Sequence, residues 1–110
     1  MAFVEVSETN QLDELFAQSS EKPVILFKHS LTCPISHAAY EEMSLLKDEP
    51  VFLVVVQDAR RLSNEIATRT NVKHESPQTI IMHDGSVVWH ASHYDITKAS
   101  VLRSLEELKQ

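Results

Sequence analysis

Hydrophobic residues follow two spacings along the chain, and each spacing predicts one kind of element. Short runs that are almost wholly apolar, such as Val24–Lys28 and Val51–Val56, are typical of strands buried on both faces of a sheet. Apolar residues three or four positions apart indicate helices with one buried face. The predicted strands are Phe3–Val6, Val24–Lys28, Val51–Val56, Gln78–His83 and Ser86–Ala91. The predicted helices run from Ser7 to about Gln18, from about Pro34 to Lys47, from Ala59 to Thr70 and from Thr97 to Lys109.

Polar residues and prolines mark the ends of these elements. Ser7 and Asp58 are suited to cap the first and third helices, because their side chains accept hydrogen bonds from backbone amides. Pro34 suits the first position of the second helix, since the amide that it lacks would have no partner there. The pair Asp84-Gly85 predicts a hairpin turn between the last two strands.

The order of the predicted elements is βαβαβαββα. A helix between two buried strands predicts a parallel pair with a crossover connection, and the hairpin adds an antiparallel strand. We therefore predict an α/β fold with a central mixed sheet flanked by helices, in a single domain over residues 1–110. This order, with Cys33 between a central strand and the helix that follows it, is the plan of the thioredoxin fold.

Composition limits the cellular compartment and the classes of partner that we expect for this protein. The net charge is −6 and no run of lysine or arginine stands out, which argues against nucleic acid or an anionic membrane as a partner. The longest apolar run, Val51–Val56, is far shorter than a membrane span, and the N-terminal residues show no signal peptide. A single cysteine cannot form an intramolecular disulfide, which fits a reducing compartment. We expect a cytoplasmic protein.

Cys33 is the leading candidate for chemistry, because it lies at the start of a predicted helix and directly before Pro34. Unpaired backbone amides and the positive end of the helix dipole favour a thiolate at this place. The thiolate is the nucleophile of thiol–disulfide exchange. The alternative is an inert cysteine in the core, where this residue type is common.

Ser36 stands where a C-x-x-C redox motif would carry its second cysteine. A serine hydroxyl cannot attack a mixed disulfide, although it can donate a hydrogen bond to the sulfur. Exchange at Cys33 would therefore stop at a mixed disulfide until an external thiol resolves it. The alternative is that Ser36 belongs to an ordinary helix surface.

The pair Ser76-Pro77 is the second indication of a site. It precedes a predicted strand, at the position where thioredoxin-like proteins keep a cis-proline that faces the active cysteine. A cis-proline would leave the preceding amide and carbonyl free to bind an extended thiol substrate. The alternative is a trans proline that begins a strand.

Two cationic residues, Lys28 and His37, are candidates to add positive potential near the thiolate, in competition with simple exposure. Together with His29, His37 also forms the pattern H-x-x-x-C-x-x-x-H, which suggests a metal site. We predict no metal, because His29 ends a strand and the three residues do not share one helix face. The remaining histidines are scattered and are predicted to lie at the surface or at a sheet edge: His74, His83, His90 and His93.

The stretch Thr32-Cys33-Pro34-Ile35-Ser36 resembles the TCPIS motif of the monothiol bacilliredoxin family, general stress proteins of Gram-positive bacteria. The resemblance extends over essentially the whole chain. It implies that Cys33 is the nucleophile and that Ser36 holds the place of a missing resolving cysteine. The residues that it implies for substrate binding are Thr32, Pro34, Ser76 and Pro77.

The resemblance also implies an activity. The protein would be a monothiol thiol–disulfide oxidoreductase that removes bacillithiol from S-bacillithiolated client proteins and becomes S-bacillithiolated itself. Bacillithiol, a low-molecular-weight thiol, would be a co-substrate, and no cofactor would be bound. Two other functions stay open: binding or transfer of an iron–sulfur cluster, as in C-x-x-S proteins of this fold, and a stress-induced interaction domain whose thiol is incidental.

Overall fold

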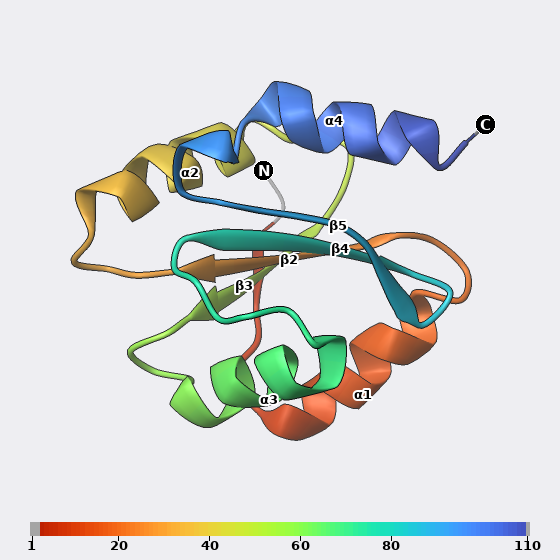
Figure 1. Cartoon of the computed structure of the whole chain (residues 1–110), viewed down its shortest axis with the longest axis horizontal. Helices are drawn as coiled ribbons and strands as arrows, with labels where there is room; N and C mark the ends of the chain where they lie inside the picture. Colours follow the sequence, from red (N-terminus) through yellow and green to blue (C-terminus); the bar gives the residue numbers. More distant parts are fainter. Residues whose placement is uncertain (1–2, 110) are drawn as a thin grey trace.

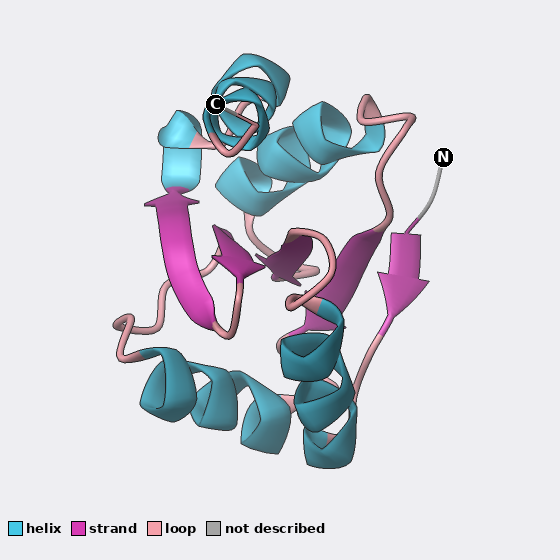
Figure 2. Ribbon diagram, turned by 90° about the vertical axis from the view of Figure 1, so that its right-hand side faces the viewer, coloured by secondary structure: helices cyan, strands magenta, loops and turns pink. Residues whose placement is uncertain are grey.

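A five-stranded sheet lies between two layers of helices in the computed structural model, which describes residues 3–109 (Figures 1 and 2). Met1, Ala2 and Gln110 of the predicted domain lie outside the described residues. The strands are β1 (Phe3–Glu5), β2 (Val24–His29), β3 (Val51–Val55), β4 (Gln78–His83) and β5 (Ser86–Ser92). The helices are α1 (Thr9–Gln18), α2 (Pro34–Ser44), α3 (Arg60–Thr70), α4 (Lys98–Glu107) and a short 3-10 helix, η1 (His93–Asp95).

The sheet is mixed and its strand order is β1-β3-β2-β4-β5. The first three strands of this order run parallel, whereas β4 is antiparallel to β2 and β5 is antiparallel to β4. The predicted α/β class and the predicted order of elements are confirmed. The largest differences from the prediction are that α2 ends at Ser44 instead of Lys47 and that the sequence does not predict η1; the other bounds agree within two residues.

Both caps predicted from side-chain type are wrong. The N-cap of α1 is Glu8, not Ser7, because the Gln11 side chain reaches back and accepts hydrogen bonds from the amides of both residues (2.9 Å each). The N-cap of α3 is Ala59, not Asp58. The Asp58 amide instead closes a turn onto the Val55 carbonyl (3.0 Å), so the helix begins one residue later.

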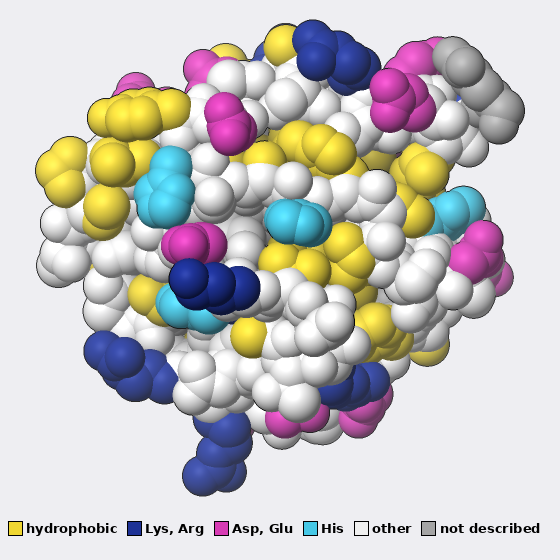
Figure 3. Space-filling model, in the orientation of Figure 1, with side chains coloured by type: hydrophobic (Ala, Val, Ile, Leu, Met, Phe, Trp, Pro, Cys, Tyr) yellow, Lys and Arg dark blue, Asp and Glu magenta, His cyan; other side chains and the backbone are white. Residues whose placement is uncertain are grey.

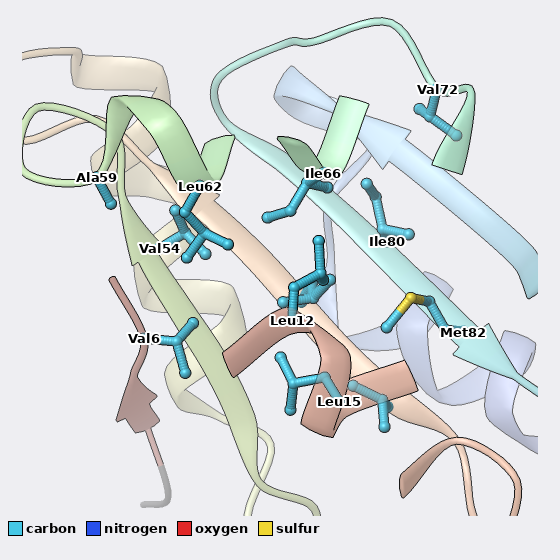
Figure 4. Packing of buried hydrophobic residues seen from close by; sticks show 12 residues of the cluster. Val6, Leu12, Leu15, Val54, Ala59, Leu62, Ile66, Val72, Ile80 and Met82 are labelled. Atoms are coloured by element: carbon cyan, nitrogen blue, oxygen red, sulfur yellow. The ribbon is translucent and has the colours of Figure 1, made fainter. Parts of the chain in front are cut away.

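Side chains of the central strand β2 alternate between two cores, one on each face of the sheet. Val24 and Leu26 belong to the core beneath α1 and α3, whereas Ile25 and Phe27 belong to the core beneath α2 and α4. All six residues of β2 are buried, as the apolar run predicted. Figure 4 shows the first core, in which side chains from α1 and α3 meet side chains from β3 and β4.

Three loops meet at one edge of the sheet. Because β2 and β3 are parallel, the loops that lead from them into α2 and α3 leave the same edge. The loop before β4 reaches this edge as well, since Gln78 pairs with Lys28 near the end of β2 (Figure 1). Gln57 joins two of the loops: its side chain donates to the Ser30 hydroxyl (2.9 Å) and accepts from the Leu31 amide (3.2 Å).

The fold predicts the effect of removing the cap of α4. The Thr97 hydroxyl accepts a hydrogen bond from the Ser100 amide (3.0 Å), and the Ser100 hydroxyl accepts one from the Thr97 amide (3.2 Å). We expect Thr97→Ala to lower the free energy of unfolding by about 1 kcal/mol, because it leaves an amide at the helix start without its partner. Chemical denaturation followed by circular dichroism measures the change.

Thr68→Ala is the matched control. Thr68 is exposed within α3, and its hydroxyl only donates back to the Asn64 carbonyl (3.1 Å). Alanine is the better helix former, so the control is expected to keep or slightly raise stability. Equal losses in both variants would contradict a capping role for Thr97.

Candidate active site

Cys33 is the N-cap residue of α2, with Pro34 as the first helical residue. Its backbone is extended and its carbonyl accepts the first helical hydrogen bond, from the His37 amide (3.1 Å). The side chain is half-buried and belongs to neither core cluster. Cys33 is therefore not part of the hydrophobic core, and its reactivity stays a prediction.

The Ser36 hydroxyl is fully buried and bonded on both sides. The side chain is 0% exposed, its oxygen accepts a hydrogen bond from the Ser30 amide (2.9 Å), and it lies 2.7 Å from Nδ1 of His29. The alternative of an ordinary helix surface is therefore wrong. A hydrogen bond from Ser36 to the sulfur, which the sequence suggests, is not found among the described residues, and the hydroxyl contacts His29 Nδ1 instead.

His29 was considered from the sequence only as a metal ligand, yet it is the partner of Ser36. It is 5% exposed, and its ring lies 4.9 Å from the Tyr40 ring and 5.7 Å from the Phe27 ring, centre to centre. Burial and, secondarily, the charge of His37 lower the pKa of His29, while a hydrogen bond with the Ser36 backbone raises it. At neutral pH the ring is thus neutral, and Nδ1 can accept the hydroxyl proton.

His37 folds back over the loop that carries the thiol. Its Nε2 donates a hydrogen bond to the Leu31 carbonyl (2.8 Å), and its side chain is exposed. His29 and His37 lie close to each other, with ring centres 5.7 Å apart. Within residues 3–109, however, no group of three or more His, Cys, Asp or Glu side chains is arranged to hold a metal ion.

Lys28 does not lie beside the sulfur, which corrects the expectation from the sequence. Neighbouring residues of a strand point to opposite faces, so Lys28 shares the α1 and α3 side of the sheet with Leu26, whereas Cys33 begins α2 on the other side. The side chain is 1% exposed. Its Nζ donates to the Ser63 carbonyl (3.1 Å) and to Nδ1 of His74 (3.1 Å).

The Ser76–Pro77 peptide bond is cis, the isomer predicted from the sequence. Pro77 is buried and its carbonyl accepts a hydrogen bond from the His93 amide (3.1 Å). Ser76 is half-buried and makes no hydrogen bond to another residue of the described chain. The other two residues predicted to contact substrate, Thr32 and Pro34, are exposed on either side of Cys33.

The comparisons with known proteins agree with this arrangement. The profile of the family described as monothiol bacilliredoxin BrxC matches residues 4–101. The chain belongs to the monothiol bacilliredoxin family. A solved structure described as a candidate oxidoreductase with a thioredoxin fold is 36% identical, covers 94% of this chain and 93% of its own, and superimposes with a TM-score of 0.87.

Thioredoxins share the fold at lower identity. The thioredoxin pre-protein of Schistosoma mansoni is 19% identical over 97% of this chain and 98% of its own, with a TM-score of 0.71. Spinach chloroplast thioredoxin f is 18% identical over 99% and 95%, with a TM-score of 0.73. Family and fold together make this bacilliredoxin a thiol oxidoreductase. None of its described helices is both long and apolar enough to span a membrane.

The buried bonds of Ser36 predict a large cost for losing its hydroxyl. Ser36→Ala leaves the Ser30 amide and His29 Nδ1 without this partner, in a place that water cannot reach. We expect the free energy of unfolding to fall by about 2–3 kcal/mol, the usual cost of stranding buried polar groups. Chemical denaturation of the reduced protein at pH 7.5 measures the change.

Ser44→Ala is the control in the same helix. The Ser44 hydroxyl only donates to the Glu41 carbonyl one turn earlier (2.7 Å). A change within about 0.5 kcal/mol is expected for this position. If Ser36→Ala were equally mild, the bridge from Ser36 to His29 and Ser30 would not carry the stability assigned to it.

The burial of Lys28 predicts a gain in stability when its charge is removed. Burial lowers the pKa of Lys28 from 10.5 to about 8, so the folded state holds an ammonium that would be better solvated in the unfolded chain. We expect Lys28→Met to raise the free energy of unfolding at pH 7 by about 1–3 kcal/mol, since an apolar side chain of similar length avoids this cost.

The pH dependence of stability tests whether the buried charge of Lys28 destabilises the folded state. Between pH 8 and 10.5 the unfolded state binds more protons than the folded state, so the wild type gains stability as pH rises through this window. The advantage of Lys28→Met should therefore shrink between pH 7 and pH 9.5. A variant that is less stable than the wild type at pH 7 would show that the ammonium is a net stabilising contact.

Proposed function

We propose that this bacilliredoxin removes bacillithiol from S-bacillithiolated client proteins in the cytoplasm. The observation that carries the proposal is a single half-buried thiol at a helix start, next to a serine whose hydroxyl is bonded elsewhere. One accessible sulfur can take a thiol group from a disulfide, but it has no second thiol with which to release that group. The family membership supports bacillithiol as the group transferred.

The reaction has two exchange steps. In the first, the Cys33 thiolate attacks the bacillithiol sulfur of the client mixed disulfide, so that the client leaves as a thiolate and takes up a proton from solvent. In the second, the thiolate of a free bacillithiol attacks the Cys33 adduct and forms bacillithiol disulfide, which restores Cys33. The client disulfide is thereby reduced at the expense of two bacillithiol molecules, one of which was bound to the client. A separate reductase must recycle the bacillithiol disulfide.

The surroundings of Cys33 have distinct parts in this proposal. Thr32 and Pro34 are exposed on either side of Cys33 and would contact the incoming disulfide, while Ser76, held by the cis bond to Pro77, would offer its backbone amide and carbonyl. Ser36 acts by position: its bonds to His29 and the Ser30 amide fix the loop that leads to Cys33 against the first turn of α2. It takes no part in bond making.

The proposal predicts a specific covalent adduct. Reduced protein incubated with a bacillithiolated client is expected to gain the mass of one bacillithiol, located at Cys33 by peptide mapping, while the client loses it. Cys33→Ser should gain nothing and leave the client modified. A client that stays modified beside unmodified wild-type protein would overturn the assignment. The same client carrying glutathione or coenzyme A tests which small thiol is preferred.

Ser36→Cys is the informative companion variant. A thiol at this position can attack the adduct at Cys33 from within the chain, as in C-x-x-C proteins. We expect the variant to release bacillithiol and to accumulate with the mass of an internal disulfide. A stable adduct in this variant would show that position 36 is held away from the sulfur even when it carries a thiol.

A further inference from the structure

Lys28 is a buried cation without an anionic partner in the described chain. Its Nζ donates to the Ser63 carbonyl and to His74 Nδ1, and neither acceptor carries a negative charge. None of the ion pairs among residues 3–109 involves Lys28. Lysine is almost never fully buried unless it is paired with an opposite charge, so this position calls for an explanation beyond packing.

The bond from Lys28 fixes the tautomer of His74. Burial and then the charge of Lys28 lower the pKa of His74, while Glu75 acts in the opposite direction, so the ring is neutral at neutral pH. Since Nδ1 accepts from Lys28, the ring proton must reside on Nε2. The side chain is exposed, and Nε2–H is therefore a donor that the buried ammonium polarises toward the surface.

A cleft of about 160 Å³ opens in front of this pair, lined by Val56, Arg60, Ser63, Asn64 and His74. The lining includes the two residues that accept hydrogen bonds from Lys28, so the ammonium lies directly behind the wall of the cleft. Arg60, Asn64 and His74 carry side-chain N–H donors, and no acidic side chain lines the cleft. Figure 3 shows histidine, lysine or arginine, and an acidic side chain next to one another on this face, over the loop that precedes β4 in Figure 1.

We propose that this cleft binds the oxyanion group of a small ligand, a carboxylate or a phosphate. The Arg60 guanidinium would donate hydrogen bonds to two oxygens of the anion. The Asn64 amide and His74 Nε2–H would donate to the anion as well. The buried positive charge of Lys28 would stabilise its negative charge. Guanidinium donors match the planar or tetrahedral oxygens of such groups. The inference is independent of the redox proposal, because it concerns binding alone on the α3 side of the sheet.

Titration of the reduced full-length protein with succinate and, separately, with inorganic phosphate tests the proposal. Ionic strength is held constant with sodium chloride. The changes in amide NMR chemical shift of residues 60–64 and 74 should saturate as the anion is added. The ring signals of His74 should also shift, while its Nε2 stays protonated. If the shifts saturate with succinate but not with phosphate, the cleft is a carboxylate site. If they saturate with phosphate but not with succinate, it is a phosphate site. Absence of saturable shifts with both anions up to tens of millimolar would overturn the proposal.

Two arginine variants separate a site from general charge attraction. Arg60→Gln should weaken binding about tenfold, as expected for the loss of a charge-assisted hydrogen bond. Arg103→Gln makes the same charge change on the exposed side of α4, across the sheet, and should leave the affinity unchanged. If both variants weakened anion binding equally, the binding would reflect general charge attraction, and the proposed site would be refuted.

Lys28→Met tests the buried charge itself. The variant should stay folded and lose most of the anion affinity, with the same cleft residues still present. Wild-type affinity in a folded Lys28→Met protein would exclude the ammonium from the site and overturn this part of the proposal. If the variant does not fold, the comparison of Arg60→Gln with Arg103→Gln decides.

Discussion

The hydrogen-bonded bridge made by the Ser36 hydroxyl is the interaction on which the thiol site depends. One buried oxygen connects three segments: the end of β2 through His29, the loop after it through the Ser30 amide, and the first turn of α2 through its own backbone. The bridge holds the residues between β2 and α2 against the helix start, together with the bonds from Gln57 and His37 to this loop. Cys33 lies within this stretch, at the start of α2, between the residues that the bridge joins.

The bridge also explains how a serine can stand at the second position of the motif without being idle. A thiol at position 36 would take part in disulfide exchange, because a thiolate can attack a disulfide and can also be the leaving group. A hydroxyl serves structure instead, since it can accept and donate at once and is small enough to be buried with both bonds made. Serine at position 36 thus has a structural role in place of the redox role that a cysteine would have. The neutral state of His29 makes this role possible.

Much of the fold could be predicted from the chain, because its signals are local. The apolar runs of β2 and β3, Pro34 at the start of a helix and Ser76-Pro77 before β4 each specify their own segment. The partners of Lys28 are different, because they lie far from it in the sequence. His74 lies 46 residues from Lys28, and the two meet only because β4 pairs with β2 in one register. No spacing rule along the sequence contains that register.

The placement of Lys28 shows where strand geometry could have helped. Residues of a strand alternate between faces, so Lys28 had to lie on the side of Leu26, opposite the side of Phe27 and His29. What remained unknown was which face α2 would cover. The caps of α1 and α3 were missed for a related reason: Gln11 and the turn at Asp58 outcompete the residue types that usually begin helices.

The adjacency of Lys28 and His29 has an electrical consequence. Two consecutive residues of one strand send titratable groups to opposite faces of the sheet. His37 acts on His29 from the α2 side, whereas Lys28 and Glu75 act on His74 from the α3 side, and neither set crosses. The main charges that shift the pKa of each histidine therefore lie on its own side of the sheet, although only a peptide unit separates Lys28 from His29.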